Sequence, residues 1–160
     1  MIVNDRPKPM RHRSFLFILL VVAVVGMSSC RKGIVYSHFQ PISSAQWAID
    51  SIARFDYRIT DTATSYTVLI YVRHTERYPY QNIWLFVGDS LHRDTLNTYL
   101  ADDRGQWIGD KQHGFIERQI IYQPSRHYAD TGSYYLDIQH GMRDSLLRGV
   151  TDVGVEVIDN

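Results

Sequence analysis

Hydrophobic and polar residues alternate along much of the chain after residue 50. The run Phe55–Thr60 alternates with a period of two, and a longer run with the same period covers Tyr66–Arg73. This period is typical of β-strands that bury one face. The segment Ile83–Val87 is apolar at every position and is followed by a Gly-Asp turn signal. It predicts a central strand that its neighbours cover on both sides.

Further short segments have the composition of strands. We predict them at Ile34–Phe39, Asp94–Leu100, Phe115–Tyr122, Ser133–Gln139 and Thr151–Ile158. Turn sequences such as "DDRG" and "GDKQHG" separate them. Around Trp47 we expect an irregular segment or a helical turn, and among the later segments only Met142–Arg148 could form a helical turn. Parallel pairing would need crossover segments that this pattern lacks. The sequence therefore predicts an all-β domain, an antiparallel β-sandwich of about seven or eight strands, Ig-like or jelly-roll-like.

A different pattern precedes these strands. Eleven apolar residues run without interruption from Phe15 to Val25, four basic residues lie upstream, and Gly26, Ser28 and Ser29 follow. As a helix, this run spans about 16 Å, roughly half of a bilayer core. It is too short for a comfortable transmembrane helix and has the layout of a secretion signal.

The sequence Met27-Ser28-Ser29-Cys30 resembles a bacterial lipobox, in which a lipid is attached to the cysteine before the peptide is cleaved on its amino side. Methionine stands where leucine is usual, and Met10 is an alternative start. We therefore predict a signal peptide at residues 1–29 and lipid attachment, palmitate included, at Cys30. Several acyl chains would anchor the protein far more strongly than one chain does. An uncleaved anchor with an incidental cysteine is the alternative.

Removal of the first 29 residues leaves 13 basic and 16 acidic residues. A slightly negative chain of this kind gives no sign of nucleic-acid binding. Cys30 is the sole cysteine, so its acylation would leave no thiol and no disulfide, and stability must come from a packed core. We expect a lipidated N-terminal tether at residues 30–50 and a single sandwich domain at residues 51–160.

The sequence offers no clear site for a metal or for catalysis. The seven histidines are scattered and form no HxH, HxxxH or HExxH pair. The segment "ADDRGQWIGD" lacks the alternation of an EF-hand loop, and it predicts a hairpin turn with Trp107 packed on the sandwich. No nucleophile motif is present, although two of the many carboxylates could still meet on the rim and act as an acid–base pair. We expect no metal, no cofactor and no enzymatic activity.

One loop stands out as a candidate binding rim. Tyr78 and Tyr80 lie between two strong strands, where aromatic rings are not needed to fill the core, and Arg77 and Asn82 flank them. Together with Trp107, these residues could bind a sugar or a partner protein. The alternative is a turn whose tyrosines cover the end of the core.

The order of these features resembles a known family. A lipobox is followed by a strand after a tryptophan and then by "YPYQNIWLF", "RDTLNTYLADDRGQWIGD" and "GSYYLDIQHGMRDSLLRGVTDVGVEV". Over roughly residues 36 to 158 the chain is similar to the gliding-motility lipoprotein family GldH of Bacteroidetes-type bacteria. The resemblance implies a cell-envelope lipoprotein that supports the gliding machinery and its type IX secretion apparatus. It carries over Cys30 as the lipid site and offers no catalytic residues.

The resemblance also bears on location and partners. Arg31 is not the aspartate that often retains lipoproteins at the inner membrane, and no acidic export run follows Cys30. We therefore expect a lipid-anchored protein on the periplasmic side of the outer membrane, which acts as a non-enzymatic assembly or scaffold module for other envelope proteins. A carbohydrate- or peptidoglycan-binding sandwich is the alternative, motivated by Tyr78, Tyr80, Trp84 and Trp107. An envelope hydrolase with paired carboxylates is a third hypothesis.

Overall fold

The computed structural model describes residues 33–89 and 92–160, so the predicted signal peptide and Cys30 lie outside the described residues. The described residues form one short 3-10 helix, η1 (Ser43–Ala45), and eleven strands. The strands are β1 (Ile34–Pro41), β2 (Gln46–Ala48), β3 (Ala53–Ile59), β4 (Tyr66–His74), β5 (Asn82–Gly88), β6 (Arg93–Tyr99), β7 (Asp110–Gln112), β8 (Phe115–Arg126), β9 (Gly132–His140), β10 (Leu146–Arg148) and β11 (Val150–Asp159).

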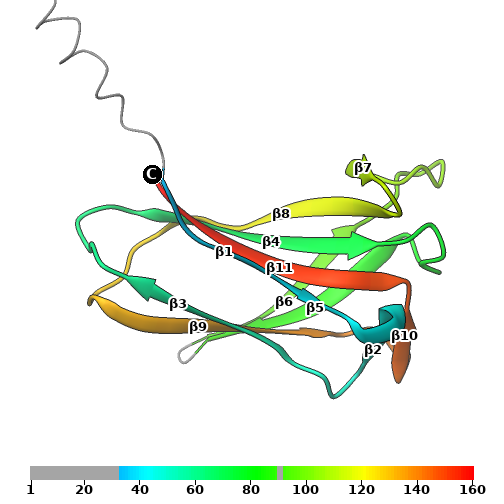
Figure 1. Cartoon of the computed structure of the whole chain (residues 1–160), viewed down its shortest axis with the longest axis horizontal. Helices are drawn as coiled ribbons and strands as arrows, with labels where there is room; N and C mark the ends of the chain where they lie inside the picture. Colours follow the sequence, from blue (N-terminus) through cyan, green and yellow to red (C-terminus); the bar gives the residue numbers. More distant parts are fainter. Residues whose placement is uncertain (1–32, 90–91) are drawn as a thin grey trace, which may run out of the picture. The chain divides into compact units, whose positions relative to one another are not determined.

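Two antiparallel sheets make up the domain. One has the strand order β1-β11-β4-β8-β7 and the other has the order β3-β9-β5-β6, while β10 and β2 form a small two-stranded sheet. Figure 1 shows the two larger sheets as two layers with their strands running lengthwise. The predicted antiparallel β-sandwich is confirmed, and each of the eight predicted strands is present.

The core lies between the two layers and follows from the period of two. Alternate residues of β3 and β5 are fully buried, among them Phe55 and Leu85, and they face Ile70 and Val155 of the other sheet. Full burial of one such side chain contributes about 1.5–3 kcal/mol. Because no disulfide is available, this apolar layer holds the two sheets together.

Side chains connect the sheets along both open edges. On one edge, the Gln40 amide of β1 donates a hydrogen bond to the Arg54 carbonyl of β3. On the other edge, the Tyr122 hydroxyl of β8 donates to Asp94 at 2.5 Å, and Arg126 forms an ion pair with Asp89 at 2.5 Å. The two edges are therefore closed by polar contacts of side chains and not by continuous strand pairing.

The structure corrects the prediction of a helical turn in Met142–Arg148. Leu146–Arg148 form β10, and Leu147 pairs with Trp47 of β2. Both side chains are buried, so burying them against the end of the core favours an extended pair over a helical turn. Around Trp47 the predicted helical turn exists only as η1, which ends just before β2.

The sandwich also begins before residue 51. β1 pairs with β11 over most of its length, and Lys32–Asn160 form one compact unit. Residues 34–48 are therefore part of the domain and not part of a tether. The sequence masked this because β1 is an edge strand, so its polar and aromatic residues alternate only weakly between exposed and partly buried positions.

Candidate binding surface

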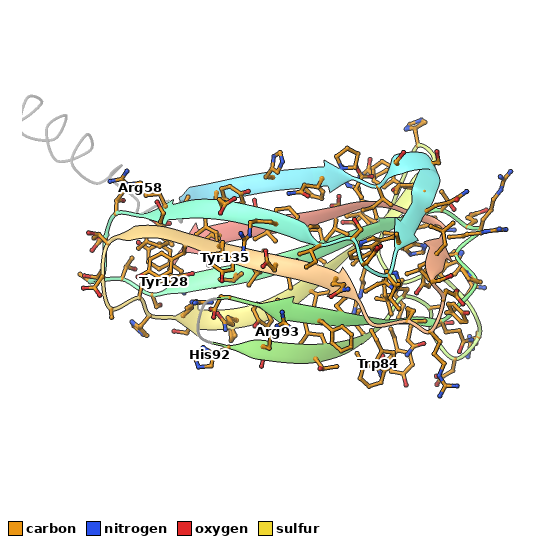
Figure 2. All side chains as sticks on the ribbon, turned by 90° about the horizontal axis from the view of Figure 1, so that it is seen from below. Arg58, Trp84, His92, Arg93, Tyr128 and Tyr135 are labelled. Carbon is orange, nitrogen blue, oxygen red and sulfur yellow. The ribbon has the colours of Figure 1, made fainter. Side chains whose placement is uncertain are left out.

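Three aromatic rings project from the outer face of the four-stranded sheet. Trp84, Phe86 and Tyr99 are exposed by 41%, 45% and 59%, and we call them the aromatic surface. Trp84 and Phe86 are on β5, and Tyr99 lies on β6 opposite Asn82. Figure 2 shows Trp84 pointing away from the sandwich. Rings of this size are rarely exposed together without a partner, which makes this face the candidate site.

The aromatic surface follows from the sequence of β5. Ile83, Leu85 and Val87 fill the core, and the residues between them must point to the opposite side. β5 is indeed central, because it lies between β9 and β6. The prediction that it is covered on both sides is wrong, however, because the domain has only two layers and no described element lies over this face.

Two hollows adjoin the aromatic surface among the described residues. The larger has a volume of about 370 Å³ and lies beside Phe86, between β9 and the β5–β6 hairpin. The smaller has a volume of about 280 Å³ and lies beside Trp84, where β9 leads toward β10. Both are open depressions on the outer face, as a binding site for a protein side chain or a sugar would require.

Three carboxylates line the larger hollow, and each has a donor. Asp137 binds Arg54 through two hydrogen bonds of 2.8 and 2.9 Å. Asp94 accepts a hydrogen bond from the Tyr122 hydroxyl, and Asp89 is paired with Arg126. Burial raises the pKa of the Tyr122 phenol, and the bond to Asp94 raises it further. The carboxylates serve here to hold neighbouring strands and edges together.

The smaller hollow is lined by residues of two loops and β5. Tyr80 is 37% exposed, and its hydroxyl donates to the Asp144 carboxylate at 3.0 Å. The bond to Asp144 raises the pKa of Tyr80. Asn82 donates to Asn97 on β6 at 2.7 Å, and Arg143 is exposed at the border. This arrangement places an indole, a phenol, an amide and a guanidinium around one depression.

Gly141 allows the backbone after β9 to approach the rings closely. A Cβ at this position would lie 3.0 Å from a ring carbon of Phe86 and 3.3 Å from the Cβ of Trp84. The Gly141 amide donates to the Trp84 carbonyl at 2.7 Å. The Phe86 ring and the Cβ of Trp84 therefore lie directly against a glycine, which fixes where the aromatic surface meets the smaller hollow.

The structure divides the predicted rim into separate groups. Tyr78 is only 3% exposed, and its hydroxyl donates to the Asn82 carbonyl at 2.9 Å. Trp107 is partly buried against the core, with its ring centroid 4.7 Å from that of His74. Both rings cover the end of the core, which was the structural alternative for this loop. The predicted hairpin is present, with Ala101 bridged to Trp107.

Of the remaining rim residues, Tyr80 and Asn82 line the smaller hollow. Arg77 lies apart from them, in a depression next to Lys111 and Phe115. Sequence reasoning missed Phe86 and Tyr99 as candidate site residues. The available signal was the apolar character of β5 on both faces, combined with a chain that offers no third layer to cover it.

Two histidines are fully buried at the end of the core near Trp107 and Trp47. His74 Nδ1 lies 3.0 Å from the Thr75 carbonyl, and His140 Nε2 lies 3.1 Å from the Trp47 carbonyl. The other ring nitrogen of each has no hydrogen-bond partner in the structure. Burial lowers the pKa of both histidines, so they are neutral at pH 7 and belong to the core.

The described residues contain no group of three His, Cys, Asp or Glu side chains that could hold a metal ion. Across residues 33–89 and 92–160 there is also no helix with the length and apolarity that a membrane-spanning helix needs.

Comparison with known proteins identifies the family. Residues 34–157 match the family model of the GldH lipoprotein. The chain belongs to the GldH lipoprotein family. The match runs from β1 to β11 and so contains the aromatic surface and both hollows. GldH membership makes the chain a lipoprotein of the cell envelope, as the sequence predicted.

Two curated relatives agree with this assignment. The chain is 28% identical to the gliding motility lipoprotein GldH homolog of Christiangramia forsetii, and the match covers 92% of this chain and 98% of that protein. It is 26% identical to the gliding motility lipoprotein GldH of Flavobacterium johnsoniae, over 87% of this chain and 93% of that protein.

A solved structure, dimeric latent PorU from Porphyromonas gingivalis, also matches this member of the GldH family. The match has a TM-score of 0.39 and 8% identity, and it covers 84% of this chain but 14% of the PorU chain. No argument about function follows from a likeness of this size.

Proposed function

We propose that this GldH protein is a non-enzymatic assembly module, in which the aromatic surface binds another envelope protein of a gliding and type IX secretion complex. Lipid on Cys30 would anchor it on the periplasmic side of the outer membrane. The single observation that carries the proposal is the exposure of Trp84, Phe86 and Tyr99 on one sheet face. Both curated relatives carry gliding motility in their names.

The chemistry of this face suits a protein partner. Exposed aromatic residues are enriched at the centres of protein interfaces, where a few of them supply most of the binding energy. Trp84 and Phe86 alternate on one strand, and Tyr99 extends the same face on the neighbouring strand. A partner that covered the three rings would remove their exposed apolar area from water, which favours association.

The proposal of a non-enzymatic role rests on the carboxylates around the larger hollow. Asp137, Asp94 and Asp89 each have an arginine or tyrosine donor, so their oxygens are engaged in structural contacts. A general base or nucleophile needs a lone pair that is available to the substrate. Acylation of Cys30 would also remove the sole thiol of the chain.

Site-specific photo-cross-linking in intact cells tests the proposal. A photoreactive phenylalanine analogue replaces Phe86, and a matched control carries it at Ile121, which is 64% exposed on the outer face of the other sheet. We expect a reproducible adduct with one envelope protein from position 86 and none from position 121. Trp84→Ala should weaken the adduct, because truncation of an interface hot spot costs about 2 kcal/mol, or roughly 30-fold in affinity.

Two results would contradict the proposal. Equal adduct patterns at positions 86 and 121 would show that the aromatic surface is not a selective interface. A Trp84→Ala variant that retains the full adduct would show that the exposed rings do not contribute to binding.

The smaller hollow supports a second candidate function, the binding of carbohydrate or peptidoglycan. Its border combines the Trp84 and Tyr80 rings with the polar side chains of Asn82 and Arg143. Aromatic rings pack on the apolar faces of sugars, and amides and guanidinium groups can bind their hydroxyls. Sedimentation with purified peptidoglycan distinguishes this function: the protein should co-sediment, and Tyr80→Ala should reduce binding while Ile121→Ala does not.

A further inference from the structure

The described domain begins very close to the predicted lipid. Only Arg31 and Lys32 separate Cys30 from Gly33. Gly33 is already fixed to the end of β11, because its carbonyl accepts a hydrogen bond from the Asp159 amide at 3.1 Å and its own amide donates to the Asp159 carboxylate. Three residue steps span at most about 11 Å even when fully extended. If Cys30 carries the lipid, Gly33 therefore stays within about 11 Å of the bilayer surface.

Several segments gather at the end of the domain where Gly33 lies. Asn160 binds Ser65 and Thr64 of the loop 60–65, and its side-chain amide donates to the Pro124 carbonyl at the end of β8. The loop 127–131 joins β8 to β9 at the same end, since Gly132 pairs with Ile59. We call this the terminal end. In Figure 1 the C-terminus lies at this end of the sandwich.

The opposite end carries a different set of side chains. The loops 75–81, 100–109 and 141–145 meet there, joined by the contacts Tyr80–Asp144 and Leu100–Gln81. These loops and their borders carry the exposed cations Arg77, Arg104, Lys111, Arg143 and Arg148. By contrast, the loops 60–65 and 127–131 of the terminal end contain no lysine or arginine, with Arg58 exposed at the border of the first loop, and the exposed loop residues are mostly small or hydroxylated.

We propose that the terminal end is a lipid-facing surface: the two-residue linker holds the loops 60–65 and 127–131 against the lipid headgroups, and the aromatic surface is presented away from the membrane. This inference rests on the proposed lipidation of Cys30 and deepens the proposed function, because it states where a partner must be. The loops 60–65 and 127–131 themselves contain no lysine, no arginine and no large exposed apolar side chain, although Arg58 and Ile34 are exposed beside them, so the contact follows mainly from the tether.

The length of the strands excludes the inverted orientation. Trp84 lies at the level of Gly141, nine residues along from Gly132, which is about 30 Å at roughly 3.3–3.4 Å per residue. If the opposite end faced the membrane, Gly33 would stand about that far from the lipid. The linker reaches no more than about 11 Å. Figure 2 shows the same separation, with Arg58 toward one end and Trp84 toward the other.

A sideways orientation with the aromatic surface on the lipid also strains the linker. Gly33 leads into β1 of the five-stranded sheet, whereas the aromatic surface belongs to the outer face of the four-stranded sheet. Sheets in a sandwich are about 10 Å apart, and the outward side chains add to this separation. Gly33 would then be held at or beyond the limit of the linker, so the terminal end is the surface that the tether favours.

Fluorescence quenching by nitroxide-headgroup lipid tests this orientation on the full lipidated chain in phosphatidylethanolamine vesicles. Because Cys30 is acylated, an introduced cysteine is the sole free thiol for a fluorophore. Thr62→Cys labels the terminal end, Thr95→Cys labels the outer face of β6 beside the aromatic surface, and Asp103→Cys labels the opposite end; the three positions are exposed. We expect several-fold stronger quenching at position 62 than at position 95 or 103.

A linker insertion provides the matched variant. Twelve Gly/Ser residues between Lys32 and Gly33 add about 20 Å of flexible reach, at roughly 5–6 Å × √n. We expect this insertion to reduce quenching at position 62 while the protein stays on the vesicles.

Each remaining outcome overturns the inference. Quenching at position 95 equal to that at position 62 would mean that the aromatic surface lies on the lipid, and strongest quenching at position 103 would mean an inverted domain. Dissociation of the full chain from the vesicles would show that it has no lipid anchor, and the inference would fail. The photo-cross-linking experiment is independent of these results, since a selective adduct at position 86 would support the assembly role even if the orientation were different.

Discussion

The outer faces of the two sheets show how the same architecture can produce a closed and an open surface. On the five-stranded sheet, the Arg73 guanidinium lies 3.7 Å from the centre of the Phe39 ring and binds Glu117 at 2.6 Å. Tyr71 packs against Phe39 and donates to Glu156 at 2.6 Å. Each aromatic ring and each charge on this part of the face has a partner within the domain.

The four-stranded sheet is different along β5 and β6. Among the described residues, Trp84, Phe86 and Tyr99 neither stack on another ring nor lie under a cation. The sheet is not uniformly open, because at the neighbouring strands Arg54 covers the Tyr135 ring and binds Asp137. The candidate interface is therefore the β5–β6 half of one face, where the domain leaves three aromatic rings exposed to water.

The largest expected effect is the difference in stability between substitutions on the buried side and on the exposed side of β5. Leu85 is fully buried and Phe86 is exposed, although they are adjacent. Leu85→Ala should lower the free energy of unfolding by about 2–5 kcal/mol, through lost burial and the cavity left behind. Phe86→Ala should change it by about 0.5 kcal/mol or less. Urea unfolding measures both, and equal losses would show that Phe86 is buried, for example against a second copy.

Substitution of two glycines tests the difference between the two outer faces, because each glycine lies under an aromatic ring. A Cβ on Gly154 would lie 2.6 Å from two ring carbons of Phe39, which Arg73 and Tyr71 hold in place. Gly154→Ala should therefore cost about 1–3 kcal/mol by overpacking. A Cβ on Gly141 would lie 3.0 Å from Phe86, and this ring is free to move outward. Gly141→Ala should cost less in thermal unfolding, and a larger cost for Gly141→Ala would contradict the open surface.

We expect pH to change the stability of the domain through its buried histidines and to leave binding at the aromatic surface unchanged. Burial lowers the pKa of His74 and His140 in the folded state, so the unfolded chain binds more protons as the pH falls through 6.5. Stability is then lost toward lower pH, by at most about 1.4 kcal/mol per pH unit for each histidine.

Urea unfolding between pH 8 and 5.5 measures this loss, and His140→Gln should reduce the slope. No histidine lines either hollow, so partner binding through the aromatic surface should not change over the same range while the domain stays folded. A binding affinity that follows the histidine titration would contradict the separation of core and surface.

The smallest effects concern the two ion pairs. The side chains of Arg73 and Glu117 are 25% and 20% exposed, whereas those of Arg54 and Asp137 are 52% and 29% exposed. A double-mutant cycle should give about 1 kcal/mol for the first pair and about 0.5 kcal/mol or less for the second, because water screens the exposed pair more strongly. Equal coupling energies would mean that the closed face is not better partnered than the open one.

Local patterns predicted the strands well. The alternation in Phe55–Thr60 and Tyr66–Arg73 located β3 and β4, since a strand with one buried face must repeat every two residues. The same rule failed for Leu146–Arg148, where three residues are too few to show a period. It also failed to include β1 in the domain, because an edge strand has neighbours on one side only and its pattern is weak.

The candidate site was less predictable than the fold. Tyr78, Tyr80 and Trp107 are all aromatic residues of loops, and nothing in their local sequence distinguishes the exposed Tyr80 from the others. Whether such a ring caps the core or faces water depends on contacts with distant segments, such as the bond from Tyr80 to Asp144. The sequence identified these aromatic residues as candidates, but it could not show which of them are buried and which are exposed.

By itself, the sequence predicted a secretion signal and a lipobox with Cys30, and it indicated a disulfide-free chain of alternating strands in the GldH family. These features are local, so they can be read from neighbouring residues. Only the tertiary structure decided that Trp84, Phe86 and Tyr99 share one uncovered face and that Gly33 is fixed at the far end from Trp84. These facts depend on strand order and layer number, which arise from pairing between segments far apart in the chain.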